Sequence, residues 1–309
     1  MEVSILLAQK IVAMALMGII GYVIVRNGLF RVQDSQVLSK LVVYVISPCL
    51  IVNSFQIEYS SSKAKGLILA FVISFLIHLL LIAIAWILGK VFRLNNVDKA
   101  SIIYSNAGNL VVPLVQGILG VEWVFYASAY IMAQSIFIWS QGTSLLCNEK
   151  GINLKKIFTN PNVIAVLLGC AMFFTKISLP AIVGDCVSGV AAMIAPASMM
   201  VIGMLLADVN LKKLFSQKRP YVVCFFRLIF VPFIVIVLSR ITGVLSLHAD
   251  AENIMMVVLL ATMAPVASMV TQISQVYGGD GVYASALNVM SVLLCIVTMP
   301  LMLLFYEWI

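Results

Sequence analysis

The stretch SNAGNLVVPLVQGILG, residues 105–120, joins a polar beginning to an apolar end. Asn106, Gly108 and Asn109 lie shortly before Pro113. A proline within a helix cannot donate to the carbonyl four residues earlier, and its ring crowds that carbonyl. The stretch therefore predicts a helix that is broken at Pro113, with side-chain amides beside the break.

The rest of the chain indicates the surroundings of this helix. Of its 309 residues 63% are hydrophobic and 10% charged, whereas soluble domains are about half apolar and a quarter charged. Apolar runs of about 20 residues, long enough to cross a bilayer as helices, recur along the whole chain. The first run follows Glu2 and has no cleavage pattern, so we interpret it as a spanning helix and not as a signal peptide. The composition predicts an all-α integral membrane protein.

Hydropathy and turn residues predict ten spans. They cover residues 4–25, 36–57, 66–92, 100–120, 122–146, 160–176, 187–207, 220–243, 252–277 and 281–306.

Positive charges predict the orientation, because cytoplasmic loops are enriched in lysine and arginine. Thirteen of the 19 lysines and arginines lie at alternate junctions. These are Arg26, Arg31, Lys40, Lys90, Arg93, Lys99, Lys150, Lys155, Lys156, Lys212, Lys213, Lys218 and Arg219. We expect these junctions in the cytoplasm and both termini outside the cell membrane. The net charge of +7 thus indicates a bilayer and not nucleic acid.

The two halves of the chain resemble each other. Three landmarks recur in the same order at offsets of 157, 152 and 148: YASA at 126 and 283, Pro113 with Pro265, and Pro48 with Pro196. We expect two repeats, 1–150 and 151–309, of five helices each. An odd number of spans inverts the second repeat across the membrane. Inverted repeats are typical of secondary transporters that work by alternating access.

The paired prolines predict the site. Pro265 is followed by Ser268, Thr271 and Gln272, so the ninth span has a polar break to match the fourth. Broken helices at membrane depth are tolerated where they are buried or line a polar cavity. If the fourth and ninth spans cross, their half-helix N-termini meet, and such ends favour an anion.

These segments resemble a known family. Asn106, Gly108, Pro113 and Leu114 match the auxin efflux carrier pattern Asn-Thr-Gly-x-x-Gly-x-Pro-Leu, although Val111 replaces its second glycine. Further matches are Pro265, the Tyr277-Gly278 pair with Asp280 after it, the ending VTMPLMLLFY, and NLKKIFTNPNVIAVLLG at 153–169.

The resemblance implies ten helices with a scaffold part and a transport part. It implies an elevator-like carrier of organic anions, such as a malate permease-like protein for dicarboxylates or a carrier of indole acetate, often as a homodimer. By motif position Asn106 contacts the substrate carboxylate. Ser268 replaces an asparagine that many bacterial members carry, which leaves the substrate open. Coupling to H⁺ or Na⁺ stays open too.

Several other polar residues in the predicted spans are open to more than one interpretation. Arg227 is the one basic residue well inside a span, where a role in countering substrate charge competes with snorkelling to the cytoplasm. Asn53 either lines the cavity or joins helices. For His78 we expect a hydrogen bond to a neighbouring helix, with a titrating switch as the alternative. Gln134 and Gln141 share one helix face, and we expect helix packing there.

Other functional classes are disfavoured by what the sequence lacks. The six cysteines are scattered, with no metal-ligand spacing and no disulfide framework. Asp208 lies beside Lys212 and Lys213 and is interpreted as interfacial. No nucleophile–base pair or carboxylate dyad for an intramembrane enzyme is evident, and no cofactor is indicated. A gated central site suits the broken helices better than a channel. The main alternative is a membrane sensor that binds an organic anion without transporting it.

Overall fold

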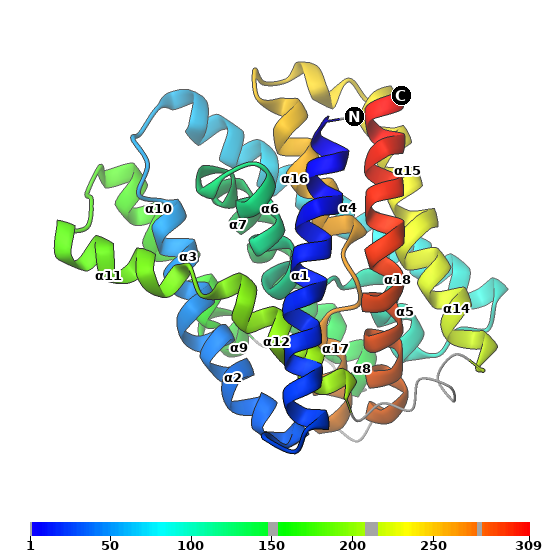
Figure 1. Ribbon diagram of the computed structural model, residues 1–309. Helices are drawn as coiled ribbons and strands as arrows, with labels where there is room; N and C mark the ends of the chain where they lie inside the picture. The colour runs from blue at the N-terminus through cyan, green and yellow to red at the C-terminus, as the bar shows by residue number, and fades with distance from the viewer. Residues whose placement is uncertain (1, 148–153, 208–215, 277–279) are drawn as a thin grey trace.

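The computed structural model describes residues 2–147, 154–207, 216–276 and 280–309. These residues form helices and connections, with no β-strand among them. In the first half the helices are α1 (Glu2–Arg26), α2 (Ser35–Leu41), α3 (Ser47–Ser54), α4 (Ser61–Val91), α5 (Asn96–Ile103), α6 (Val112–Ile118), α7 (Val121–Phe137) and α8 (Thr143–Cys147). The second half contains α9 (Leu154–Phe158), α10 (Pro161–Thr175), α11 (Ala181–Ala191), α12 (Ile194–Leu206), α14 (Lys218–Phe225), α15 (Val231–Ile241), α16 (Ala251–Met263), α17 (Ser268–Val276) and α18 (Gly281–Trp308). Both termini lie at the same end of the molecule (Figure 1).

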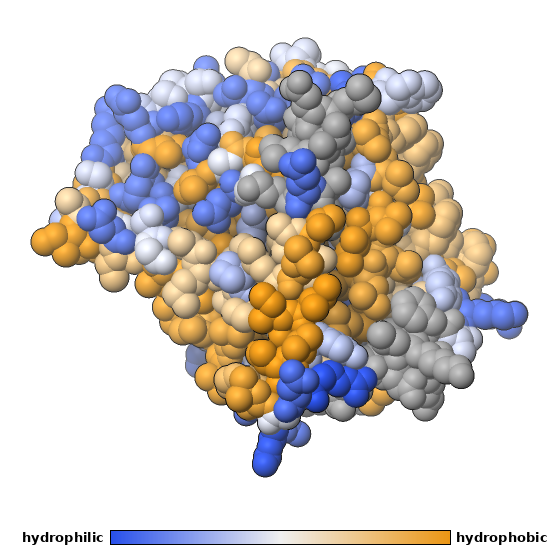
Figure 2. Space-filling view, in the orientation of Figure 1, coloured by the Kyte–Doolittle hydropathy of each residue, from blue (hydrophilic) through white to orange (hydrophobic). Residues whose placement is uncertain are grey.

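Six helical segments are long and apolar enough to cross a membrane. They are Val32–Ser54, Ser61–Val91, Val121–Leu146, Ala181–Leu206, Lys218–Ile241 and Gly281–Trp308. Shorter apolar helices cover Val12–Arg26, Pro161–Thr175 and Ala251–Met263. Figure 2 shows apolar residues over the right and lower middle of one face, with hydrophilic residues gathered along its top and at its lowest tip. The chain is therefore a multi-pass membrane protein.

The fourth and the ninth predicted spans are each interrupted by several residues of non-helical backbone. The first break, residues 104–106, separates α5 from the π-helical turn η3 (Ala107–Val111) that leads into α6. The second break, residues 264–267, separates α16 from α17. The second break falls at Pro265, where it was predicted. Ala264 before this proline is extended, with φ −64° and ψ 154°, as the proline ring requires of the preceding residue.

The first break is not where the sequence predicted it. Pro113 lies inside the helical run 107–118, and Val112 before it is helical, with φ −56° and ψ −50°. The turn η3 widens the helix one residue ahead of the proline and so accommodates its ring and missing N–H. Wide turns also precede Pro48 and Pro232, as η2 (Val42–Ile46) and η5 (Phe226–Phe230).

One group of helices is built on a close contact between α1 and α12, which lie against each other in the centre of Figure 1. Gly203 of α12 meets Gly18 of α1 so closely that a Cβ on Gly203 would be 1.8 Å from the Gly18 carbonyl oxygen. A Cβ on Gly21 would lie 2.3 Å from the carbonyl oxygen of Met200. Small residues permit this approach between membrane helices. Helices α2, α3, α10 and α11 pack on the same group.

A second group contains both breaks. Helix α4 packs along α7, α17 packs on α18, and α14 and α15 lie beside α16 and α18. Asp98 of α5 links three helices of this group, α5, α14 and α18. Its buried carboxylate accepts hydrogen bonds from Arg219 of α14, at 2.9 Å from Nε, and from the Tyr283 hydroxyl of α18 at 2.7 Å. The groups meet where α1 contacts α6 and α18 and where α3 and α10 contact α7.

Candidate functional site

The two breaks lie against each other. Ser105 and Val266 form an isolated antiparallel β-bridge. The amide nitrogen of Asn106 donates to the carbonyl of Pro265 at 2.8 Å. Because no water is available in hydrocarbon, every backbone group there must be satisfied inside the protein. The amide nitrogen of Ala267 also donates to the carbonyl of residue 104 at 3.0 Å. Each break therefore satisfies some of the backbone groups of the other.

The first break is also held by a side chain of the next helix. The Gln134 side-chain carbonyl of α7 accepts from the Ser105 amide nitrogen and hydroxyl, each at 2.9 Å. The Gln134 amide nitrogen donates to the Ser105 carbonyl at 2.9 Å. The Gln134 side chain thus bonds the backbone N–H and C=O of Ser105, as a neighbouring strand does in a β-sheet. Its role is more specific than the helix packing expected from the sequence.

The second break is held in a similar way by α18. The Asn288 side-chain amide donates to the Val266 carbonyl at 2.7 Å, and the Val266 amide nitrogen donates to the Ser291 hydroxyl at 3.0 Å. Ser291 is 157 residues after Gln134, which is the offset between the two YASA sequences. In both breaks, the backbone is therefore hydrogen-bonded by polar side chains from the helix that follows the broken span, α7 for the first and α18 for the second.

Arg227 joins the two broken helices. Its side chain is fully buried in η5, so it does not snorkel to the surface. The Nε atom donates to the carbonyl of Ala264 and Nη1 donates to the carbonyl of Ile102, each at 3.0 Å. These carbonyls lie at the C-terminal ends of α16 and α5. Nη2 has no hydrogen-bond partner within the part of the chain that the structure describes.

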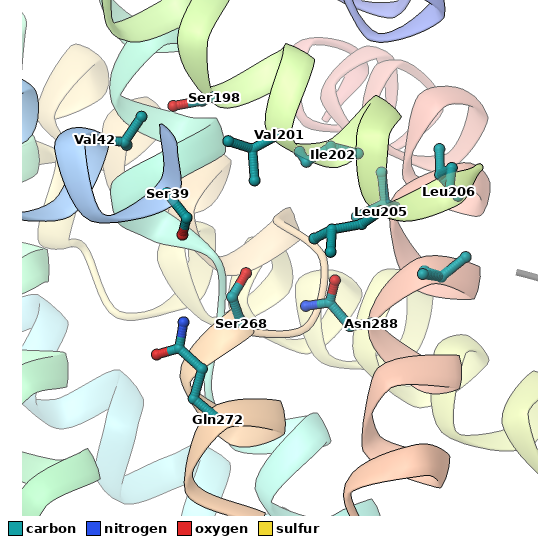
Figure 3. Close-up of a pocket in the computed structure, with 12 residues that line it drawn as sticks. Ser39, Val42, Ser198, Val201, Ile202, Leu205, Leu206, Ser268, Gln272 and Asn288 are labelled. Carbon is teal, nitrogen blue, oxygen red and sulfur yellow. The ribbon is translucent and has the colours of Figure 1, made fainter. Parts of the chain in front are cut away.

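A cavity of about 70 Å³ lies between the two helix groups. Its polar lining consists of Ser39 of α2, Ser198 of α12, Ser268 and Gln272 of α17, and Asn288 of α18, and the other lining residues are valine, leucine and isoleucine. Figure 3 shows Ser39, Ser268 and Gln272 pointing toward one another across it. The Ser198 hydroxyl is buried and makes no hydrogen bond to the described residues.

The N-terminus of a half-helix lies at this cavity, because Ser268 is the first residue of α17. The first N–H groups of a helix have no partner within it, and they carry partial positive charge. These donors, together with hydroxyl and amide side chains, suit an anion. The lining contains no charged side chain among the residues that the structure describes.

A second, apolar cavity of about 330 Å³ lies next to the first. It is formed by α1, α12, α18 and the run 107–118, and its lining is apolar except for Tyr22. Ile202, Leu206 and Val292 line both cavities. The two spaces together offer a small polar end and a larger apolar end.

The structure brings only part of the predicted site to the polar cavity. Ser268 and Gln272 line it. Asn106 is 5% exposed and is not among the residues that line the cavity. Gly108 faces Asn162 of α10, whose Nδ2 would lie 3.9 Å from a Cβ. The buried hydroxyl of Thr271 has no partner among those residues.

Other predicted residues lie elsewhere. Pro113, Arg227 and Asn53 do not line the polar cavity, and Asn53 is half-buried in α3. The side chain of Asn109 and the whole of Asp208 lie outside the described residues.

His78 differs from its prediction. Its Nδ1 lies 2.7 Å from the Ser74 carbonyl of its own helix, so the bond is not to a neighbour. The ring contacts α7 by stacking on Phe137 instead.

The sequence interpretation missed Ser39, Ser198, Asn288 and Ser291. Each is a small polar residue in an apolar run. Ser39 and Ser198 come from helices distant in sequence from the breaks, whereas Asn288 and Ser291 belong to the helix that follows α17. Asn288 and Ser291 had a usable signal, since residues three apart share a helix face and both follow the second YASA sequence. Among the described residues no group of three or more His, Cys, Asp and Glu is placed to hold a metal ion.

The paired breaks and the cavity between two helix groups define a polytopic membrane protein with an internal polar site. The family model described as "Membrane transport protein" matches residues 6–153 and residues 150–303. The chain therefore belongs to this family, which is the auxin efflux carrier family that its motifs resemble. Comparison with curated proteins gives no match.

Proposed function

We propose that this protein is a secondary carrier of small organic anions that works by alternating access. Its site lies where the first and second breaks meet, and two inverted five-helix repeats form it, with the broken fourth and ninth spans crossing. Membership of a transport family supports transport. The matching closure of the two breaks by Gln134 and by Asn288 with Ser291 supports the repeat.

The observation that carries the proposal is the polar cavity at the N-terminus of α17. One water molecule needs about 10–15 Å³ of such cavity space, so a cavity of about 70 Å³ has room for a group the size of one carboxylate. Ser268, Gln272 and the half-helix N–H groups supply donors to such a group. Asn106, whose backbone nitrogen donates to the Pro265 carbonyl at 2.8 Å, would join them when the site opens.

The adjoining apolar cavity bears on the class of anion. An anion with one carboxylate and an apolar body, such as indole acetate, suits a polar cavity of about 70 Å³ beside an apolar one of about 330 Å³. A dicarboxylate such as malate would place its second charge among aliphatic side chains, which is unfavourable without a partner. We therefore favour an apolar monocarboxylate.

The motion we propose is an elevator-like shift of the second helix group, which carries both breaks, along the first. The polar cavity lies at the boundary, with Ser39 and Ser198 on the first group and Ser268, Gln272 and Asn288 on the second. Movement along this boundary would separate the two sets of side chains. The glycine contact between α1 and α12 lies within the first group and would stay fixed.

The test is flux into proteoliposomes of malate, succinate, 2-oxoglutarate and indole acetate. We expect indole acetate to move. Ser268→Ala and Asn106→Ala should each reduce its initial rate about tenfold or more, the equivalent of losing one hydrogen bond to a charged group. Ser285→Ala, in the same helix as Asn288 but away from the cavity, is the matched control and should keep full flux.

Three outcomes separate the alternatives. Flux that survives Asn106→Ala and Ser268→Ala unchanged would place the site elsewhere. Movement of malate but not indole acetate would reverse the preferred substrate class. Stoichiometric binding with no flux of any anion would favour the membrane sensor.

A further inference from the structure

Among the described residues, the charge of Arg227 has no ion-pair partner. No aspartate or glutamate within the described residues lies at ion-pair distance from it. Its side chain is nevertheless fully buried. An isolated charge in a membrane interior is unfavourable unless other groups compensate it. The hydrogen bonds that the structure shows for this charge go to backbone carbonyls.

The two carbonyls that Arg227 contacts lie at helix C-terminal ends. Those of Ile102 and Ala264 belong to the ends of α5 and α16, where the last carbonyls of a helix have no partner within it and carry partial negative charge. At a pair of breaks four half-helix ends meet, two positive and two negative. Arg227 bonds both negative ends, while the positive end of α17 faces the polar cavity.

In carriers with broken helices, unwound carbonyls and half-helix C-terminal ends are the groups that hold a coupling Na⁺ or H⁺. Here a guanidinium is bonded to those groups. We infer that Arg227 is a resident cation that replaces an inorganic coupling ion at the breaks. It positions the two broken helices without loss of charge during the transport cycle. This inference rests on the proposed carrier function, and it makes transport independent of Na⁺ and K⁺.

The alternatives for Arg227 are less consistent with its contacts. It does not line the polar cavity, so direct contact with the substrate carboxylate has no support. Two of its donor atoms are directed at carbonyls from two different helices, one in each half of the chain. A purely structural arginine would stabilise the fold but would not predict how flux responds to inorganic cations. The two roles therefore differ in a measurable way.

The first experiment measures thermal unfolding of the purified protein in detergent. Arg227→Ala should unfold at a lower temperature than the wild type. Millimolar guanidinium chloride should raise the unfolding temperature of Arg227→Ala more than the same concentration of choline chloride does, and should not raise that of the wild type. Arg240→Ala is the matched control, because Arg240 donates to the Tyr306 carbonyl at 2.8 Å in the continuation of the same helix but at a partly exposed position. It should show no comparable rescue.

The second experiment measures flux with Na⁺ and K⁺ replaced by choline on both sides. Wild-type flux should be unchanged, Arg227→Ala should lose about tenfold or more, and guanidinium should restore part of it. Wild-type flux that requires Na⁺ or K⁺ would overturn the inference. So would an Arg227→Ala protein with wild-type stability, or one that guanidinium does not rescue. If the wild type moves no anion, the proposed carrier function fails, while guanidinium rescue of stability still decides whether a cation belongs at this place.

Discussion

The amide nitrogen of Asn106 donates to the carbonyl of Pro265 at 2.8 Å, so a break in the first half of the chain is completed by a break in the second. An unsatisfied backbone group in hydrocarbon is unfavourable by several kcal/mol. Neither break would be stable alone, and each depends on the other half being folded. This mutual dependence gives the polar site a fixed geometry inside an apolar molecule.

Gln134→Ala should destabilise the first break. The substitution removes three hydrogen bonds and leaves the Ser105 amide and carbonyl without their side-chain partner. Two buried groups left unsatisfied are expected to lower the free energy of unfolding by about 2–5 kcal/mol. Unfolding in detergent micelles measures this. Gln116→Ala, at a half-buried glutamine of α6, should change stability by about 0.5 kcal/mol or less, and equal effects at the two positions would contradict the role of Gln134.

Gly203→Ala should loosen the first helix group. Its Cβ would be 1.8 Å from the Gly18 carbonyl oxygen, so the backbones of α1 and α12 would have to separate. Overpacking of this kind lowers the free energy of unfolding by about 1–3 kcal/mol or more. Gly189→Ala is the matched control, because a Cβ there meets nothing within 4 Å. That variant should stabilise the protein by about 0.5–1 kcal/mol, so the two substitutions should shift the unfolding temperature in opposite directions.

The two prolines that led the sequence interpretation behave differently for a physical reason. At Pro265 the helix breaks, and the preceding residue is extended. At Pro113 the widened turn η3 takes up the missing hydrogen bond, and the helix continues. Both solutions relieve the same clash. The sequence alone therefore predicts a disturbance at each proline, and the surrounding contacts decide its form.

The all-α membrane class and the family could be predicted because they depend on composition and on motifs local in sequence. The polar cavity is different, since Ser39 and Ser198 come from two helices whose packing against α17 and α18 no local pattern reveals. Ser268 and Gln272 were identified because they follow the break itself. Arg227 was identified as unusual from its position, but its contacts with both broken helices depend on tertiary structure.

Cysteine labelling should show which end of the molecule is outside the cell. The charge distribution predicts the connection after α15 outside and the connection before α14 in the cytoplasm. In a chain with its six cysteines replaced, Leu247→Cys, at a position 67% exposed, should react with a membrane-impermeant maleimide in intact cells. Gln217→Cys should react only after permeabilisation. The opposite pattern would reverse the proposed orientation.

The ion pair between Asp98 and Arg219 should have a measurable but modest coupling free energy. The Asp98 side chain is fully buried whereas that of Arg219 is 48% exposed. Removing one partner of a fully buried pair lowers stability by about 3–5 kcal/mol, and exposed pairs contribute about 0–1. For this half-exposed pair we expect a coupling free energy of about 1–2 kcal/mol from a double-mutant cycle of Asp98→Asn and Arg219→Gln.

Asp98→Asn should be the more harmful single change, because the same carboxylate also accepts from Tyr283 at 2.7 Å and from the Asn95 amide nitrogen at 2.9 Å. Tyr283→Phe should therefore lower the free energy of unfolding by about 1 kcal/mol. Lys218→Gln, at an exposed neighbour of Arg219, is the control and should have little effect. Strict additivity of the Asp98 and Arg219 changes would show that the ion pair adds nothing.

Because these helices all belong to the group that we expect to move as one, the variants should reduce the amount of folded carrier while the KM of the remaining carrier stays unchanged.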